Sequence, residues 1–423
     1  MKQIVKLKKE TSFIVIMIIA LFAFNACSSD DDNVATDEGS SELTINDYVQ
    51  IATGQVTLYD KDGAVINSLS SGDTFYGQDA NYLKGVTMSF NEDDEGITTD
   101  NNTGLMWEQI PTTDEFTWEE AKEYCENLEL GGYDDWRMPN LKELYSVADF
   151  GKGWPYIDTN YFALASGEVS KDEQFWSSNL YVGVTVEGGA NAAFGVNIVT
   201  GHIKAYAASM PEDGGTDGGT PPDGNTPPPG DGNGAPTGNP LAKYVRAVRG
   251  DVYGTNSFTA NGDDTVSDSN TGLMWAQGDD GVTLDWADAL AYAENSELAG
   301  YTDWRLPNVK ELQGIVDYSH SPTATDAANV GPAIDPIFDC TEMISEAGYD
   351  DYGYYWTGTS ANFTSGQPYY YAWYVAFGRA VNDEGEDFHG AGGVRFDTKD
   401  VDGPAGEDAE RYYNYVRLVR DIN

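Results

Sequence analysis

The sequence predicts an α+β fold that is built twice along one chain of 423 residues. Three observations predict it: a long internal repeat divides the chain, two helix signals occur early in each copy, and short strand-like segments separated by Gly, Asn and Asp follow. We therefore expect two tandem domains, each with two helices and short, mostly antiparallel strands.

The repeat sets the domain boundaries. Three segments occur in both copies, at 103–107 and 271–275, at 133–144 and 301–312, and at 244–249 and 415–420. Thr103 and Thr271 are 168 residues apart, as are Tyr133 and Tyr301, so the sequence between these segments carries no net insertion. We expect a first domain at 48–250 and a second at 251–423.

A Gly- and Pro-rich run at 210–240 resembles an interdomain linker in composition. However, the closing segment 244–249 of the first copy follows this run, and its counterpart 415–420 stands near the end of the second copy. We therefore interpret 210–240 as a disordered insertion before the last strand of the first domain.

Helix signals precede strand signals in both copies. Apolar residues from Trp118 to Leu128 fall at helical spacing behind Thr117, which forms a capping-box pattern with Glu120. The corresponding segment of the second copy starts at Trp286 behind Asp285. Asn140 with Glu143, and Asn308 with Glu311, predict the start of a second helix in each copy. Residues 184–186 and 244–249 are typical of strands.

The N-terminus predicts export and lipid anchoring. Basic residues precede the apolar run from Phe13 to Phe24, which is too short to span a membrane but suits a secretory signal. The run ends at Phe24-Asn25-Ala26-Cys27, which resembles a bacterial lipobox, and the acidic stretch after it resembles the surface-export signal of Bacteroidetes lipoproteins. We expect a signal peptide at 1–26, lipid attachment at Cys27, an acidic tether at 27–47, and a location on the outer membrane at the cell surface. The alternative is an ordinary secretory signal with an incidental Cys.

Charge and composition exclude several partners. The chain has 23 Lys and Arg against 70 Asp and Glu, for a formal net charge of −47. Nucleic-acid binding depends on clustered basic residues, and an anionic membrane surface would repel such a chain. We expect no nucleic-acid partner and membrane contact only through the lipid anchor. Three Cys and three scattered His predict neither a disulfide framework nor a His-rich metal site.

Most of the tryptophans are expected in the core. Eight of the ten occupy paired positions in the two copies, which is typical of packing residues. Arg137 and Arg305 stand between the two predicted helices, where each could bond loop carbonyls or pair with Asp135 or Asp303. At least one arginine of each closing segment is expected to face inward. We expect Cys125 to be a small buried apolar group.

Aromatic residues that differ between the copies are the better candidates for ligand binding. The second copy has dense tyrosine clusters interleaved with Asp, and rings beside carboxylates and amides suit sugar recognition. The candidates are Trp154, Tyr352, Tyr354, Tyr370 and Trp373. The alternative is that alternate rings are the inner faces of strands.

Catalytic and metal signals are weak. The sequence has no nucleophile-elbow pattern, and acidic pairs carry little information among 70 acidic residues. The segment Asn261–Asn270 is rich in oxygen ligands, so Ca²⁺ is conceivable, but we expect a hairpin with Asx turns. We expect no catalytic residue, no metal ligand and no cofactor.

These ordered motifs, present twice, resemble the C-terminal domain of the Legionella collagen-like adhesin. The resemblance implies a fold related to C-type lectins and to formylglycine-generating enzymes, and a role in adhesion. It also implies a set of structural signature residues: Trp107, Trp136, Arg137, Pro139, Trp275, Trp304, Arg305 and Pro307. The adhesin binds sulfated polysaccharides, a ligand that we do not carry over to a chain of charge −47. The Ca²⁺–sugar tripeptides of C-type lectins and the reactive Cys pair of the formylglycine-generating enzyme are missing.

The sequence thus predicts a surface-anchored, non-enzymatic, adhesin-like protein with a glycan or protein ligand outside the cell. Two alternatives are a polysaccharide hydrolase that uses an Asp/Glu pair and a structural subunit of a surface assembly. The sequence leaves the ligand and the oligomeric state open.

Overall fold

The computed structural model describes residues 49–209, 241–345, 347–405 and 411–422. The expected signal peptide 1–26, the lipid-attachment residue Cys27, the tether 27–47 and the insertion 210–240 lie outside the described residues. We refer to residues 90–250 as copy one and to residues 251–423 as copy two.

Each copy contains a small antiparallel sheet that is closed by the last strand of that copy. In copy one the strand order is β3 (Phe90–Glu92), β4 (Ile97–Asp100), β5 (Met106–Glu108) and β9 (Val248–Arg249). In copy two it is β10 (Phe258–Ala260), β11 (Thr265–Asp268), β12 (Leu273–Ala276) and β18 (Val419–Asp421). The closing segments therefore return to the first strands of their own copies.

The paired helices form where the sequence predicts them. They are α2 (Trp118–Glu126) and α3 (Leu141–Ser146) in copy one, and α4 (Trp286–Glu294) and α5 (Val309–Gly314) in copy two. The capping boxes of Thr117 and Glu120, of Asn140 and Glu143, and of Asn308 and Glu311 are all present, and Asp285 accepts from the backbone N–H of Asp288. Such caps satisfy the N–H groups that a helix start leaves unpaired. Two single-turn 3₁₀ helices, Leu298–Gly300 and Ala327–Asn329, are also in copy two.

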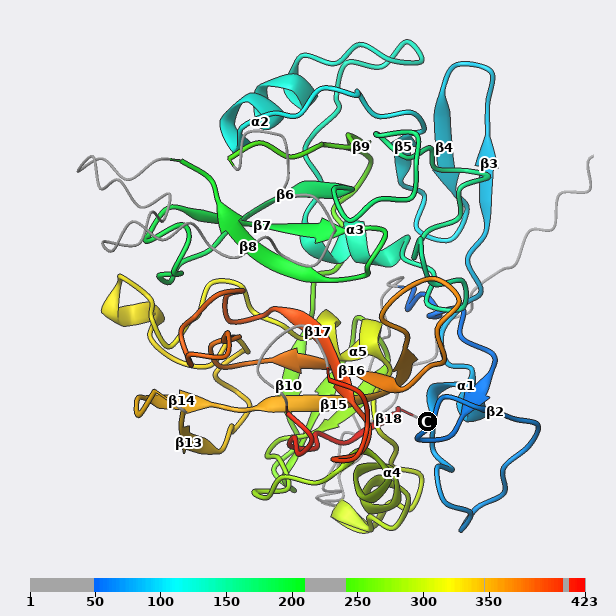
Figure 1. The fold of residues 1–423 in the computed structure, drawn as a ribbon, viewed down its shortest axis with the longest axis vertical. Helices are drawn as coiled ribbons and strands as arrows, with labels where there is room; N and C mark the ends of the chain where they lie inside the picture. The colour runs from blue at the N-terminus through cyan, green and yellow to red at the C-terminus, as the bar shows by residue number, and fades with distance from the viewer. Residues whose placement is uncertain (1–48, 210–240, 346, 406–410, 423) are drawn as a thin grey trace, which may run out of the picture. The chain divides into compact units, whose positions relative to one another are not determined.

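A six-stranded antiparallel sheet joins the copies (Figure 1). Copy one contributes β6 (Gln174–Leu180), β7 (Ala192–Asn197) and β8 (Ile203–Ala207). Copy two contributes β15 (Tyr354–Ala361), β16 (Tyr371–Ala376) and β17 (Val394–Thr398). The two halves of this sheet meet where Val394 of β17 pairs with Ile203 of β8. A separate pair, β13 (Glu342–Ile344) and β14 (Asp350–Tyr352), is also in copy two.

Residues 49–89, which we call the N-terminal strap, contact both copies. The strap contains β1 (Leu58–Tyr59), β2 (Val65–Ile66) and the one-turn helix α1 (Asp79–Tyr82). Gln55 exchanges two hydrogen bonds with the backbone of Ser360 in copy two, at 2.9 and 2.7 Å. On the other side, the N–H of Phe150 in copy one donates to the carbonyl of Thr53 at 2.7 Å. The strap therefore connects the copies in addition to the shared sheet.

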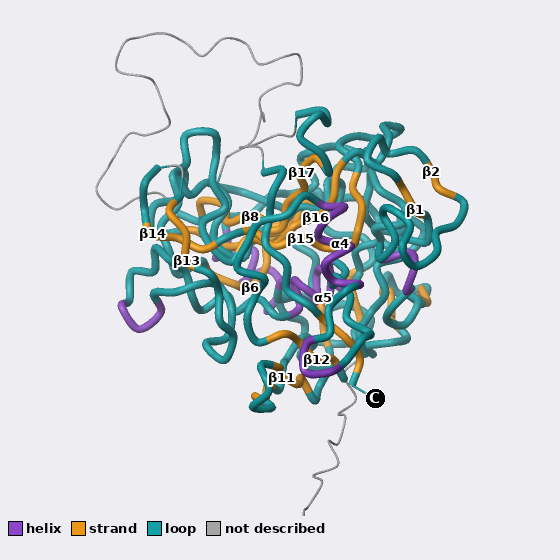
Figure 2. The backbone as a smooth tube through the Cα atoms, turned by 90° about the horizontal axis from the view of Figure 1, so that it is seen from below, coloured by secondary structure: helices purple, strands orange, loops and turns teal. Residues whose placement is uncertain are grey.

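The largest core cluster is also shared. It contains buried residues from both copies, and the ring of Phe194 in β7 packs edge-on against that of Tyr318 in copy two, with centroids 4.8 Å apart. Two smaller clusters each belong to one copy. The architecture is mostly antiparallel sheet with short helices and long loops (Figure 2), which agrees with the predicted α+β class.

Two strand predictions need correction. Residues 184–186 form a turn, in which Thr185 bridges to Gly189, because the glycines at 188 and 189 reverse the chain at once. Of the segment 244–249, Val248–Arg249 is regular strand and Tyr244 makes an isolated bridge to Phe175. Within the described residues, no helix is long and apolar enough to cross a membrane.

Candidate functional site

Trp373, one of the five aromatic candidates for ligand binding, lies in the shared core. Its side chain in β16 is 0% exposed, and its ring makes edge contacts with Phe150 and Tyr156 of copy one at 5.3 and 5.4 Å. A side chain without access to solvent cannot meet a ligand in this conformation. Trp373 therefore joins the copies and is not part of a binding surface.

Tyr354 is also a packing residue. It is 6% exposed, its ring stacks on that of Tyr374 at 5.0 Å, and its hydroxyl donates to the carbonyl of Arg379. Like Trp373, Tyr354 fits the alternative interpretation, in which alternate aromatic residues of a strand form its inner face. Tyr352, at the end of β14, is half-buried.

Trp154 and Tyr370 are half-buried and both pack against the shared core. They belong to two loops that meet: the hydroxyl of Tyr156 donates to Oδ1 of Asn362 at 2.8 Å, and Gly153 lies against the hydroxyl of Tyr369. The five aromatic candidates therefore do not form one site.

The signature arginines hold the second helix of each copy. The guanidinium of Arg137 forms two hydrogen bonds with the carboxylate of Glu143, at 2.8 and 2.6 Å. Arg305 does the same with Glu311, at 2.7 Å for both bonds. Such bidentate pairs fix both position and orientation.

Of the two alternatives for these arginines, pairing with Asp135 or Asp303 is wrong, whereas Arg137 does donate to a loop carbonyl, that of Gly250, at 3.3 Å. Arg249 pairs with Asp135 and Arg420 pairs with Asp303, each with a shorter bond of 2.7 Å. The acidic residue that binds the signature arginine is instead the third residue of the following helix, which also caps that helix. The capping-box pattern in the sequence could have predicted that this acidic residue is the partner of the signature arginine.

The remaining signature residues are buried. The exposure of Trp107, Trp136, Trp275 and Trp304 is at most 3%, and Pro139 and Pro307 are buried as well. The inward arginines of the closing segments are Arg246 and Arg417, each of which donates to three backbone carbonyls. Cys125 is 0% exposed, as predicted.

The segment Asn261–Asn270 forms the predicted Asx-turn hairpin. The carboxylate of Asp268 accepts from the N–H groups of Ser257 and Asn270 and from the hydroxyl of Thr271. Within the described ranges, no group of three or more His, Cys, Asp or Glu is arranged to hold a metal ion.

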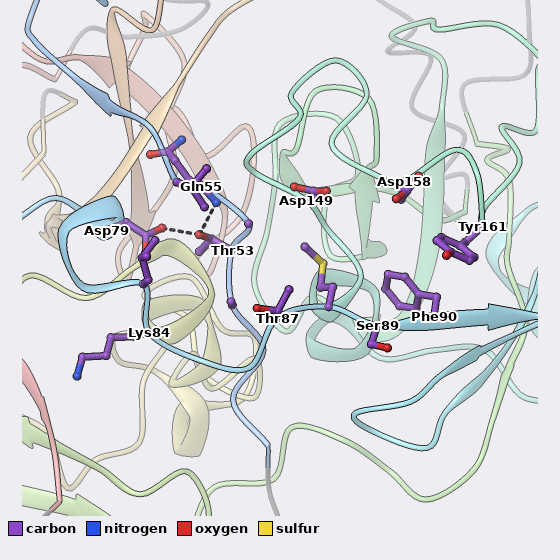
Figure 3. A pocket seen from close by; sticks show the side chains of 15 residues that line it. Thr53, Gln55, Asp79, Lys84, Thr87, Ser89, Phe90, Asp149, Asp158 and Tyr161 are labelled. Carbon is purple, nitrogen blue, oxygen red and sulfur yellow. Dashed lines mark hydrogen bonds between the residues drawn. The ribbon is translucent and has the colours of Figure 1, made fainter. Parts of the chain in front are cut away.

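A pocket of about 490 Å³ lies between the strap and the loop 149–161 of copy one (Figure 3). We call it the strap pocket. Its lining combines hydroxyl and carboxylate side chains with apolar and aromatic ones: Ala52, Thr53, Gly54, Gln55, Val56, Asp79, Leu83, Lys84, Thr87, Met88, Ser89, Phe90, Asp149, Asp158 and Tyr161. Its volume is within the range of small-molecule sites, roughly 300–1,000 Å³.

One side of the strap pocket is formed by Asp79 at the start of α1. Its Oδ2 accepts from the hydroxyls of Thr53, at 2.5 Å, and Thr359, at 3.0 Å. Burial raises the pKa of Asp79 to about 6, and the nearby Glu311 carboxylate adds to the increase, against the effect of the threonine hydrogen bonds. Figure 3 shows Asp79 beside Thr53 and Gln55, across the pocket from Asp158.

The other side carries two carboxylates and two rings. Asp149 and Asp158 come from the loop 149–161, and the rings of Phe90 and Tyr161 pack at 5.6 Å (Figure 3). Burial favours a higher pKa for Asp158, but hydrogen bonds from Lys152 and Asn160 outweigh it, and its pKa lies below the usual range. Phe90 is buried and Tyr161 half-buried, so the wall presents chiefly the Tyr161 ring next to hydrogen-bond acceptors.

The sequence analysis missed this pocket. Copy two has no counterpart of the strap of similar length, because copy one ends near Gly250 and the first strand of copy two, β10, already begins at Phe258. This unmatched segment before the repeat was the available signal. Its position against both copies could not be read from local patterns.

The structure thus consists of two copies of an α+β domain, each with a bidentate arginine–glutamate pair that we call the arginine clip, and a pocket beside the strap. The Lcl C-terminal domain family matches the chain twice, over residues 96–212 and 264–420. These matches cover more than half of the chain, which belongs to this family. The resemblance drawn from the motifs is confirmed to that extent. No match is found among curated proteins or among solved structures.

Proposed function

We propose that the protein is a surface-anchored, non-enzymatic, adhesin-like protein that recognises a carbohydrate through the strap pocket. The observation that carries this proposal is the wall on which the half-buried Tyr161 ring, packed against the buried Phe90, lies beside the Asp149 and Asp158 carboxylates. Apolar ring faces pack on the C–H faces of a sugar, and carboxylates accept bonds from its hydroxyls.

Family membership and sequence features support the surface role. The chain belongs to the Lcl C-terminal domain family, and its N-terminus suits export and lipid attachment at Cys27. In this proposal the protein is held at the outer membrane by its lipid, and each copy has a C-type-lectin-like fold. Metabolic labelling with a radioactive fatty acid tests the anchor. We expect the wild-type protein to be labelled and the Cys27→Ser variant to carry no label.

A concave site favours a carbohydrate over a protein ligand. A stable protein interface covers about 800 Å² on each partner, mostly across broad surfaces. The strap pocket is instead a cavity of about 490 Å³ with several polar groups facing inward. A sugar chain that inserts one or two residues fits this arrangement better.

The test is a broad glycan array probed with residues 28–423, which contain the whole compact unit Thr44–Asn423. We expect specific binding that Tyr161→Ala weakens at least about tenfold, a difference of about 1.4 kcal/mol. The control is Tyr413→Ala, which removes an exposed ring outside the pocket. A blank array with natively folded protein, or equal binding by both variants, would contradict the proposal.

A glycan hydrolase is the second candidate, favoured by one observation. The pKa of Asp79 is raised to about 6 by burial, whereas that of Asp158 is lowered, and enzymes separate an acid from a base in this way. This candidate predicts that bound glycans are cleaved and that Asp158→Asn abolishes cleavage. Binding without turnover over a long incubation would dismiss it.

A further inference from the structure

We propose that the strap pocket selects a saccharide that bears a free amino group, such as a hexosamine. This inference rests on the proposed function and names its ligand class. It starts from charge: the pocket is lined by Asp79, Asp149 and Asp158, against the single lysine Lys84. The chain as a whole carries −47, so no distant field offsets this local excess.

The nearby lysines are already engaged. The ammonium of Lys84 is 2.6 Å from Asp421, and that of Lys152 is 2.7 Å from Asp158. Lys310 is buried and donates to the carbonyls of Ala52 and Ser146, and burial lowers its pKa to about 7. A sulfate or carboxylate on a sugar would therefore find acidic groups in the pocket and no available cation.

Asp149 is the carboxylate open to a ligand. Its Oδ1 accepts from the N–H of Gly151 at 3.0 Å, and within the described part of the chain its Oδ2 has no hydrogen-bond partner. The group is half-buried in the pocket wall. An ammonium group on a bound sugar would donate a hydrogen bond to this Oδ2 and form an ion pair with the carboxylate.

The strap holds Asp149 in place. Gly54 has a φ of +84°, and a Cβ there would lie 2.4 Å from Oδ1 of Asp149. Gly151 likewise leaves no room for a side chain, since its Cβ would be 2.1 Å from the carbonyl of Gly54. These glycines allow the two backbones to touch, and the carboxylate is fixed before any ligand binds.

Copy two shows the same position without an open carboxylate. Asp317 stands 168 residues after Asp149. Its Oδ1 accepts from the N–H and the hydroxyl of Ser319, and its Oδ2 lies 2.9 Å from Nδ1 of His320. The copies therefore differ at this carboxylate in whether an oxygen is left for a ligand.

The experiment is calorimetric titration of residues 28–423 with a glucosamine tetrasaccharide and with its N-acetylated form. It is done at about pH 6, where carboxylates of ordinary pKa are largely ionised and amines are protonated, whereas Asp79, with a pKa of about 6, is about half protonated. We expect the free amine to bind at least about tenfold tighter. Asp149→Asn should remove this preference, and the matched variant Asp317→Asn should retain it.

A third titrant, tetralysine, separates the pocket from general attraction of cations to an acidic chain. We expect tetralysine to bind more weakly and without sensitivity to Asp149→Asn. Equal affinity for the free and acetylated sugars would overturn the inference while leaving the proposed function in place. Tetralysine binding that is strong and lost in Asp149→Asn would also overturn it, in favour of a cationic peptide. The comparison of the two sugars uses the unaltered protein, so a folding defect in a variant leaves the inference testable.

Discussion

The two copies carry the same arginine clip in different surroundings. The side chain of Arg137 is 29% exposed, whereas that of Arg305 is 3% exposed, although both hold the equivalent glutamate. The N-terminal strap causes the difference, because Tyr82 of α1 lies near the Arg305 guanidinium and Lys84 pairs with Asp421 beside it. One motif can thus be a half-exposed clip in one copy and a buried ion pair in the other.

Hydrogen bonds made by residues of the repeated motifs are the same in the two copies. The indole N–H of Trp118 donates to the carbonyl of Ser177, and its counterpart Trp286 donates to that of Thr357, both at 2.8 Å. Trp176 and Trp356 likewise both donate to a carbonyl before the first helix. Duplication has preserved these interior contacts, while the surroundings of the motifs have diverged.

The largest difference between the copies is expected from removing the clip glutamate. Glu311→Gln leaves the buried Arg305 with only the longer contact to Asp421, at 3.4 Å, and breaking a buried ion pair costs about 3–5 kcal/mol. Glu143→Gln should cost less, about 1–3 kcal/mol, because water reaches Arg137. Urea unfolding of both variants measures the two values. Equal losses of unfolding free energy would mean that the strap does not change how much the arginine–glutamate pair contributes to stability.

The next effect tests the strap through Asp79, which has no counterpart in copy two. Its folded pKa of about 6 lies above the ordinary value of 3.8, so the folded state binds the extra proton between these values. Wild-type stability should therefore fall, relative to Asp79→Asn, as the pH rises from about 4 to about 6. A shift of about two units corresponds to about 3 kcal/mol. Chemical unfolding of both proteins across this range gives the difference, and parallel curves would refute the expectation.

The smallest effect comes from a pair of equivalent tyrosines. The hydroxyl of Tyr124 donates to the buried carboxylate of Glu108 at 2.5 Å, but copy two has Ala276 in place of that glutamate, opposite Tyr292. A pocket of about 170 Å³ lies there instead. Tyr124→Phe should cost about 1.5–3 kcal/mol, the value of a hydrogen bond to a charged group. Tyr292→Phe should change stability by less than about 0.5 kcal/mol. Thermal unfolding of the two variants compares them directly, and a loss of similar size in both would show that the carboxylate is not what Tyr124 contributes.

Much of each copy was predictable because its determinants are local or repeated. The helix starts follow from capping patterns within four residues, such as Asn140 with Glu143, and the core positions of the paired tryptophans follow from their recurrence. Trp373 was misjudged because a strand pattern shows which residues share a face but does not show what covers that face.

By itself, the sequence determined the two copies, their helices and caps, the buried arginines and the tryptophan core. Short-range periodicity and the repeat encode these features directly. The tertiary structure alone decided that β8 and β17 join the copies, that the strap reaches across both, and that Asp149 keeps an open carboxylate oxygen. These features depend on contacts such as that of Gln55 with Ser360, which are 305 residues apart. Such contacts leave no periodic trace in the sequence, because they arise only when separately folded surfaces pack against each other.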